Sequence, residues 1–209
     1  SSDLLVGANG VGKSTLLRIL VGLNTGFQGD VMVNNIPLEK KNLKTIRKNV
    51  GYVFQDADSQ LFMSTVFDDV AFAPRNYGMS EAEVNEKTME ALKVVHIEQL
   101  KDKQIYKLSG GEKKLASIAT ILSTEPDVIL MDEPSVALDP KNRRNLINIL
   151  NRLNQAKIIA SHDLNMIMDT CERTILLSDG KIIKDGNTKE ILLDKELMEE
   201  SGLELPLGY

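Results

Sequence analysis

The sequence has little of three features that would each point to a particular class of protein. Its 209 residues contain one cysteine, Cys171, so no internal disulfide can form, which fits a reducing compartment. No apolar run approaches the roughly 20 residues that a membrane-spanning helix needs. The first ten residues also lack the basic and then apolar segment of a signal peptide. Any membrane role is therefore expected to come through a partner protein.

Positive charge is not in excess either. Lys and Arg number 25 against 30 Asp and Glu, which gives a formal net charge of -5. Because phosphate contacts need clustered Lys and Arg, this balance argues against a nucleic-acid partner. The apolar fraction of 42% is ordinary for a globular protein, and the length suits one compact domain with or without a sub-domain. We expect Cys171 to be a small buried residue on a helix.

Short apolar strands alternate with helical patterns along the chain, which predicts an α/β fold with a largely parallel, covered sheet. Strands are predicted at residues 4–6, 30–33, 50–54, 128–131, 157–160, 174–177 and 181–183. Helical patterns are predicted at residues 16–21, 65–100, 111–123, 141–154 and 164–171. Asp179-Gly180 predicts a type I′ hairpin at the margin of the sheet, and Ser80 with Glu83 predicts a helix-capping box. The mostly basic stretch 40–48 is expected to be a solvated helix face.

A glycine-rich loop lies between the first strand and the first helix. Residues 7–15 read GANGVGKST, which matches the pattern G-x-x-x-x-G-K-[ST]. Glycines let the backbone wrap around a phosphate, so that N–H groups and the helix N-terminus face its oxygens. Lys13 adds a positive charge for the β- and γ-phosphates, and the Ser14 hydroxyl is a hard ligand suited to Mg²⁺. The alternative, a glycine turn that merely caps a helix, is disfavoured by the strand before the loop and the helix after it. The nucleotide-binding residues predicted in this loop are Gly7, Asn9, Gly10, Gly12, Lys13, Ser14 and Thr15.

Two carboxylates follow a buried strand near the middle of the chain. The run VILM is followed by Asp132, which can hold the surroundings of a Mg²⁺ ion, and by Glu133, which can orient or deprotonate an attacking water. Ligands collect at the carboxyl ends of strands in open α/β sheets, and His162 and Gln55 also follow predicted strands. His162 could contact the γ-phosphate, and the Gln55 amide could coordinate Mg²⁺ or hold water; taken alone, each is more often an ordinary polar loop residue. His96 has no such neighbours and is interpreted as structural.

The segment LSGGE at residues 108–112 matches the LSGGQ-type signature of ABC ATPases, with Glu112 in the fifth place. The segment SVALDP at 135–140 looks like the D-loop of that family, Gln55 like its glutamine loop and His162 like its switch histidine. The chain therefore resembles the ABC ATPases over almost its whole length. This resemblance implies a P-loop NTPase core with a mostly parallel sheet, antiparallel strands at its margin and a helical sub-domain. The implied boundaries are 1–66 and 126–209 for the nucleotide-binding core and 67–125 for the helical sub-domain.

The resemblance also implies an ATPase that uses ATP and Mg²⁺ and works as a dimer. In the family, the signature of one subunit caps the γ-phosphate held by the phosphate loop of the other, and hydrolysis releases the clamp. The partner would be an identical subunit or a related one. The implied catalytic residues are Glu133, His162 and Gln55, and the implied Mg²⁺ ligands are Ser14, Gln55 and Asp132. The signature and the D-loop add Ser109, Gly110, Gly111 and Asp139 to the nucleotide-binding residues.

A finer resemblance follows the glutamine. The segments FQDADSQLF at 54–62 and TVFDDVAF at 65–72 are similar to those of the ATP-binding subunits of cobalt, nickel and energy-coupling-factor vitamin importers. This implies a transmembrane partner that docks on the helical region, and a peripheral location on the cytoplasmic face of the membrane. Simple core packing is an equal interpretation for each apolar residue in these segments. The cargo is selected by other subunits and is not encoded here.

The chain begins six residues before Gly7, where ABC subunits normally carry antiparallel strands and an aromatic residue that stacks on adenine. We therefore expect a shortened N-terminus, an open edge at residues 30–33, and nucleotide binding weakened by roughly tenfold or more. Leu115 stands where an Arg is common after the signature, and Val136 stands where the D-loop usually has a small or hydroxyl residue. Two alternatives remain: a soluble ABC ATPase acting on DNA or the ribosome, and an inactive truncated fragment. DNA-repair members of the family carry a long coiled-coil insertion between the positions of Gln55 and Leu108, and translation-associated members carry two cassettes. This sequence shows a compact helical stretch and one cassette, which disfavours the DNA- or ribosome-linked alternative.

Overall fold

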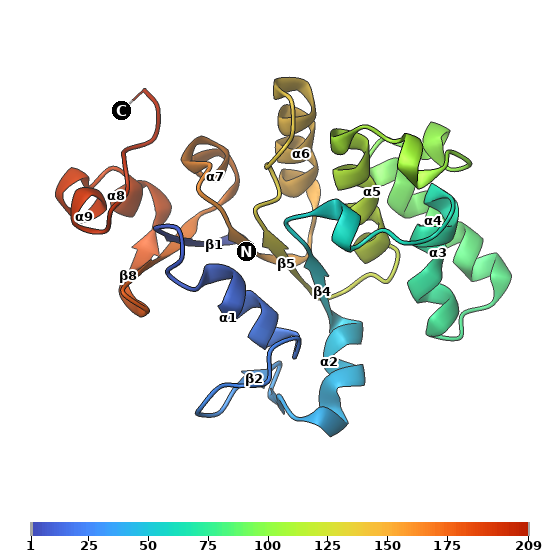
Figure 1. Ribbon diagram of the computed structural model, residues 1–209, viewed down its shortest axis with the longest axis horizontal. Helices are drawn as coiled ribbons and strands as arrows, with labels where there is room; N and C mark the ends of the chain where they lie inside the picture. Colours follow the sequence, from blue (N-terminus) through green and yellow to red (C-terminus); the bar gives the residue numbers. More distant parts are fainter. Residues whose placement is uncertain (1, 209) are drawn as a thin grey trace. The chain divides into compact units, whose positions relative to one another are not determined.

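The computed structural model describes residues 2–208 and divides into two compact units (Figure 1). The first unit comprises residues 2–52, Asp127–Glu133 and residues 154–208; the second comprises Val53–Pro126 and Pro134–Leu153. Within the described part of the chain, no helix combines the length and the apolar character that crossing a bilayer requires.

The first unit is built on a six-stranded sheet with the strand order β4-β5-β6-β1-β7-β8. β1 is parallel to both β6 and β7, β5 is parallel to β6, and β8 pairs antiparallel with β7. In Figure 1, α1 lies on one side of this sheet and α7 on the other. The strands of the sheet are β1 (Ser2–Gly7), β4 (Val50–Val53), β5 (Val128–Asp132), β6 (Ala156–Ala160), β7 (Arg173–Ser178) and β8 (Lys181–Asn187). This largely parallel α/β architecture is the predicted fold class.

Five α-helices, a short 3₁₀ helix at Lys40–Asn42 and a small second sheet complete the elements described in the first unit. The helices are α1 (Lys13–Leu20), α2 (Leu43–Asn49), α7 (Leu164–Thr170), α8 (Thr188–Leu192) and α9 (Lys195–Glu200). β2 (Met32–Val33) pairs antiparallel with β3 (Ile36–Pro37) in a two-stranded sheet. The predicted strand at 30–33 is therefore shortened to two residues. Ile46 is the buried residue of α2, so the basic stretch is a solvated helix face as predicted.

The start of α1 differs from its prediction. The helix begins at Lys13, three residues before the predicted start, because Gly12 adopts a left-handed backbone with φ 108° and takes the N-cap position. The Asp179-Gly180 turn agrees with a type I′ hairpin, since both residues have positive φ, 48° and 72°. Cys171 caps the end of α7 and is buried, which raises the pKa of its thiol to about 11. A thiol with this pKa is protonated at neutral pH and unreactive.

The second unit is helical. Its α-helices are α3 (Val66–Asn76), α4 (Glu81–Val94), α5 (Gly110–Leu122) and α6 (Pro140–Arg152), and three short 3₁₀ helices lie at Ala57–Ser59, Glu98–Leu100 and Ile105–Lys107. The predicted capping box is present at the start of α4: the Ser80 hydroxyl accepts from the Glu83 N–H, and the Glu83 carboxylate accepts from the Ser80 N–H.

A proline inside α3 ties this helix to α5. Pro74 has no N–H, so the carbonyl of Val70, four residues earlier, lacks its helical partner. The Ser123 hydroxyl, at the end of α5, donates to this carbonyl at 2.9 Å and is buried. A side chain of one helix thus supplies the donor that the other helix is missing.

Candidate active site

The glycine loop of the first unit has the backbone that its sequence predicts. Gly10 and Gly12 have φ values of 83° and 108°, a left-handed conformation that favours glycine. At Gly7 the reason for glycine is different: a Cβ there would collide with the carbonyl oxygen of Leu177 in β7. Among the described residues, no side chain caps the start of α1. The side chains of Asn9 and Thr15 are exposed beside it.

Lys13 is buried at the base of this loop, with 7% of its surface exposed. Its Nζ donates to the carbonyl oxygens of Gly7 at 2.6 Å and Ala8 at 3.2 Å. Burial lowers the pKa of Lys13, and the negative charges of Glu133 and Asp132 oppose that shift. The ammonium therefore lies within electrostatic reach of both carboxylates.

Asp132 joins the phosphate loop to the end of β5. Its Oδ1 accepts from the Ser14 hydroxyl at 2.8 Å, and its Oδ2 accepts from the Tyr52 hydroxyl at 3.1 Å. Burial raises the pKa of Tyr52 to about 12, so its hydroxyl stays protonated and keeps donating. Asp132 itself is 1% exposed. Ser14 and Asp132 thus place two oxygen atoms of the kind that Mg²⁺ prefers side by side at the start of α1.

Glu133 follows in an uncommon left-handed backbone with φ 46°. Its N–H donates to the Ala160 carbonyl at 2.8 Å. Its carboxylate accepts from the Ser161 hydroxyl at 3.0 Å and the His162 N–H at 3.3 Å, and the His162 Nδ1 lies 2.9 Å from Oε1. The Glu133 side chain is buried, whereas that of His162 is 61% exposed. The two residues predicted to act on water and phosphate are therefore in direct contact.

The predicted signature lies in the second unit, at the start of α5. Ser109 is its N-cap, and its hydroxyl accepts from the Glu112 N–H while the Glu112 carboxylate accepts from the Ser109 N–H. Glu112 also pairs with Lys103 at 3.0 Å. Burial opposes the shift, but these hydrogen bonds and the lysine lower the pKa of Glu112. Ser109 and Gly110 are exposed. A glutamate in the fifth place thus closes a reciprocal cap.

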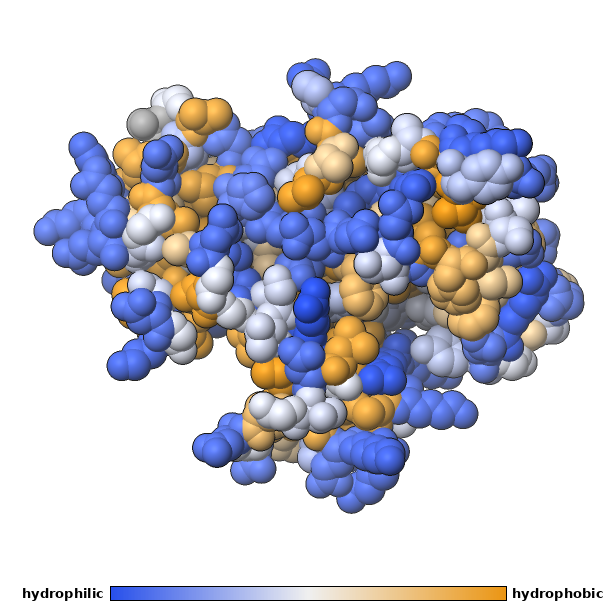
Figure 2. All heavy atoms as spheres, viewed as in Figure 1, coloured by the Kyte–Doolittle hydropathy of each residue, from blue (hydrophilic) through white to orange (hydrophobic). Residues whose placement is uncertain are grey.

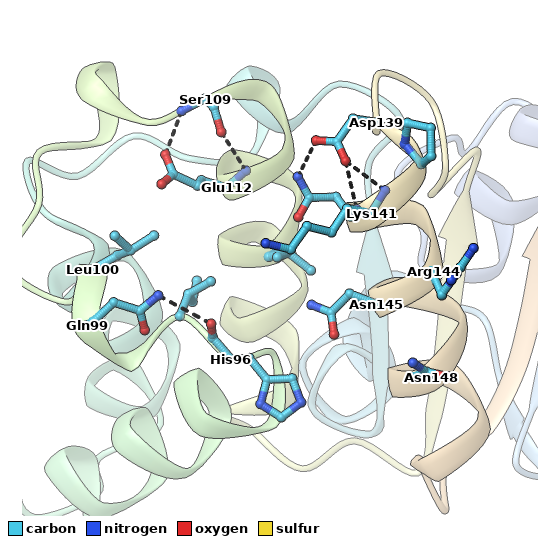
Figure 3. A pocket seen from close by; sticks show the side chains of 14 residues that line it. His96, Gln99, Leu100, Ser109, Glu112, Asp139, Lys141, Arg144, Asn145 and Asn148 are labelled. Carbon is cyan, nitrogen blue, oxygen red and sulfur yellow. Dashed lines mark hydrogen bonds between the residues drawn. The ribbon is translucent and has the colours of Figure 1, made fainter.

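The predicted D-loop aspartate caps a second helix beside the signature. Asp139 Oδ1 accepts from the N–H groups of Lys141 and Asn142, both at 2.9 Å, and Oδ2 accepts from the Asn142 amide at 2.7 Å (Figure 3). Gly111 packs against Asn142, where a Cβ would lie 2.6 Å from the amide nitrogen. Asp139, Lys141 and Asn142 line a pocket of about 880 Å³ within the second unit, with His96 exposed on its other wall.

Gln55 also belongs to the second unit, and its side chain is exposed. Its backbone carbonyl accepts from Lys114 Nζ at 2.6 Å, as does the Phe54 carbonyl at 3.0 Å. Lys114 is 3% exposed. Gln60 adds bonds from its amide to the Ser117 carbonyl and to Thr120. The segment that carries Gln55 is therefore fixed to the signature helix α5.

The structure thus groups the predicted residues into separate sets. Lys13, Ser14, Asp132, Glu133 and His162 come together in the first unit, whereas the signature, Asp139 and Gln55 belong to the second. Among residues 2–208 no three His, Cys, Asp or Glu side chains form a group that could hold a metal ion. Sequence reasoning missed Tyr52, Ser161 and Lys114. Of these three residues, Ser161 alone had a local signal in the sequence, because it directly precedes His162 after a predicted strand.

Comparisons with known proteins agree with this arrangement of motifs. The profile of the ABC transporter family matches residues 3–136. An ATP-binding protein of Geobacter sulfurreducens, whose name places it with ABC transporters, is 48% identical over 99% of this chain and 83% of its own length. The energy-coupling factor transporter ATP-binding protein EcfA of Carboxydothermus hydrogenoformans is 41% identical over 99% of this chain and 77% of its own length.

Two solved structures share the fold. CbiO1 from Clostridium perfringens, part of the ABC transporter complex CbiONQ, superposes with a TM-score of 0.83 and 36% identity, covering 95% of this chain and 82% of its own. A dimeric ATP-binding cassette in a post-hydrolysis state, bound to ADP and phosphate, superposes with a TM-score of 0.79 and 29% identity, covering 90% of this chain and 84% of its own.

Proposed function

Because this chain belongs to the ABC transporter family of ATP-binding domains, we propose that it drives a membrane importer by ATP-dependent closure of a dimer. Its homologues are ATPases, and the chain is an ATP-binding ATPase subunit of a transporter, related to the EcfA and CbiO subunits. The finer assignments of residue roles, of the dimer and of the importer are our proposal. The observation that carries it lies at the carboxyl ends of β1, β5 and β6, where Ser14 bonds to Asp132, His162 contacts Glu133, and Lys13 is within electrostatic reach of both carboxylates.

ATP fits the phosphate loop on two counts. The start of α1 has no side-chain cap, so its N–H groups are directed at whatever lies before the helix. Lys13 lies within the loop, held by the Gly7 and Ala8 carbonyls, and would bind the phosphate oxygens. Phosphoryl transfer needs little covalent help from a protein, so positioning and charge neutralisation by these groups would supply most of the rate.

Magnesium fits the same site. Mg²⁺ is usually bound by one or two protein oxygens together with substrate phosphates, and Ser14 and Asp132 present such oxygens 2.8 Å apart. When bound, the ion would neutralise charge on the phosphates. Tyr52 would hold Asp132 in place from the other side. Gln55 is proposed as a further Mg²⁺ ligand because its segment resembles the glutamine loop of the family.

Glu133 is the proposed base for the attacking water. Its buried carboxylate would orient the water and take up its proton, while His162, exposed and in contact with Oε1, would reach the γ-phosphate. Both groups extend from the carboxyl ends of neighbouring strands, β5 and β6.

The second half of the nucleotide site is proposed to come from another subunit. Ser109, Gly110 and Gly111 begin a 13-residue helix, and Ser109 and Gly110 are exposed. In the family this segment caps the phosphates on a partner subunit, and one solved relative is a dimeric cassette. Asp139 beside it would join the contact. An identical copy and a related ATPase subunit are both suitable partners.

A transmembrane partner is proposed to dock on the second unit. Phe62 and Phe72 are 65% and 39% exposed and meet edge to face at 4.8 Å between ring centroids. In Figure 2 an apolar patch lies among polar residues over the region of α3. CbiO1 belongs to a CbiONQ complex and EcfA to energy-coupling-factor transport, which supports an importer of cobalt, nickel or vitamins and a peripheral place on the cytoplasmic face of the membrane.

Changing Glu133 to Gln tests the central assignment. E133Q keeps the size of the side chain but removes the base, so we expect hydrolysis to fall by about 10²–10⁴-fold while ATP still binds. The ATP-bound dimer should then accumulate in light-scattering measurements with Mg²⁺ and ATP. E172Q, an exposed glutamate of the same unit, is the matched control and should behave as the unchanged protein. Hydrolysis at the normal rate in E133Q would refute the role given to Glu133.

A further inference from the structure

We infer that Ser161 is a positioning residue that fixes the carboxylate of Glu133 for catalysis. The inference rests on the proposed function, which makes Glu133 the base. It concerns a hydroxyl to which the proposed function gives no role. Ser161 lies at the end of β6, one residue before His162, and it is fully buried.

The Ser161 hydroxyl has a fixed direction. Its oxygen accepts from the Asp163 N–H at 3.1 Å, and its own O–H donates to Glu133 Oε2 at 3.0 Å. A serine hydroxyl normally rotates to suit its surroundings. Here an N–H can only donate and a carboxylate can only accept, so the proton of the hydroxyl must point at Glu133. Asp163 in turn caps α7 by accepting from the Met166 N–H, which anchors the backbone that holds the hydroxyl.

The backbone of Glu133 is held from the same place. Its φ of 46° is uncommon for a residue other than glycine and costs on the order of 1–3 kcal/mol. The bond from its N–H to the Ala160 carbonyl, at 2.8 Å, secures that conformation. Two consecutive residues, Ala160 and Ser161, therefore fix the main chain and the side chain of Glu133 from the neighbouring strand.

The two oxygens of Glu133 differ in what holds them. Oε2 accepts from the buried Ser161 hydroxyl at 3.0 Å and from the His162 backbone N–H at 3.3 Å, whereas Oε1 contacts the imidazole of His162, which is 61% exposed. An exposed imidazole can leave Oε1 and turn toward a ligand without opening the core. The buried hydroxyl cannot follow, so it keeps the carboxylate in place while the His162 side chain moves. Without it, the longer bond from the His162 N–H would be the remaining contact described for Oε2.

S161A tests this inference directly. A misplacement of about 1 Å at a reacting group costs on the order of 100-fold in rate. We therefore expect kcat for ATP hydrolysis in S161A to fall by about 10- to 100-fold, with KM and the affinity for ATP changed less than about threefold. The matched control is T174V, which removes another buried hydroxyl of the same unit, bonded to Thr188, far along the chain from the site. T174V should keep the normal kcat.

A double variant separates positioning from a general loss of structure. If Ser161 acts only through Glu133, adding S161A to E133Q should leave the residual single-turnover rate of E133Q unchanged. The inference is overturned if S161A keeps the normal kcat, if its ATP affinity falls as far as its kcat, or if S161A slows E133Q by the same factor as it slows the unchanged protein. E133Q with normal hydrolysis would refute the proposed function itself, whereas inactive E133Q with fully active S161A would refute only this inference.

Discussion

The two helix starts that carry the glycine motifs are built differently. α1 in the first unit begins at a left-handed Gly12 without any side-chain cap, and a buried lysine and two carboxylates lie close to it. α5 in the second unit begins at Ser109, whose hydroxyl and N–H both bond to Glu112. The first keeps its backbone donors for a ligand, and the second commits the N–H groups of Ser109 and Glu112 to its own cap.

This difference shows what each helix start can offer to a phosphate. In the cap, the Ser109 side chain and its N–H are both engaged with Glu112. The N–H groups of Gly110 and Gly111, in the first turn of α5, are the donors that such a helix start directs outward. Ser14, by contrast, donates its hydroxyl proton to Asp132. We propose that the first site carries out the chemistry and that the second contributes donors to a neighbouring subunit.

The largest effect is expected at Lys13. K13A removes the buried ammonium between the loop carbonyls, and because such electrostatic groups are worth about 10²–10³-fold, ATP hydrolysis should fall by at least that factor. Single-turnover hydrolysis and nucleotide titration measure it. K48A, an exposed lysine of the same unit, serves as the control. Hydrolysis by K13A within threefold of normal would show that the first helix start is not the site of chemistry.

In the second unit the largest effect should be on stability. K114M removes the ammonium that holds the Phe54 and Gln55 carbonyls and should lower the free energy of unfolding by about 1–3 kcal/mol. The adjacent K113M loses only a salt bridge to the exposed Asp58, which is worth about 1 kcal/mol or less. Urea unfolding of the two variants makes the comparison. Equal losses would mean that the Gln55 segment is not fixed by Lys114.

The smallest effect is a pH dependence from Tyr52. Its pKa is 10.0 in the unfolded chain and about 12 in the folded protein, because burial disfavours the phenolate. The stability that this shift contributes is complete below pH 10 and is lost as the pH rises toward 12. The free energy of unfolding should therefore fall more steeply over this range in the unchanged protein than in Y52F. Urea titrations at several pH values would show this, and coincident slopes would contradict it.

Much of the fold could be predicted because its signals are local. Apolar runs marked the parallel strands, the Asp179-Gly180 pair marked the hairpin, and Ser80 with Glu83 marked the start of α4. The start of α1 was misplaced, since the left-handed backbone of Gly12 depends on how the loop closes. Sequence spacing also overestimated the strand at 30–33, which pairs with the two-residue β3 in a small two-stranded sheet.

The site was predictable where motifs carry it and not where tertiary contacts do. Lys13, Ser14, Asp132 and Glu133 follow from short patterns. The contact between Tyr52 and Asp132 joins residues 80 positions apart, and nothing local to either residue indicates it. Lys114 reads as a surface lysine in the sequence, yet it is buried because it satisfies two backbone carbonyls 59 and 60 positions away.

The proline in α3 has a consequence for how this region can evolve. Ser123 bonds to the carbonyl that Pro74 leaves without a partner, so the cost of losing the serine depends on the residue at position 74. With the proline present, loss of the serine would leave that carbonyl without its hydroxyl donor, whereas a residue with an N–H at position 74 would supply the helical donor instead. The two sites should therefore covary, and a displacement of α3 would be transmitted to the far end of the signature helix through a directional bond as well as through packing.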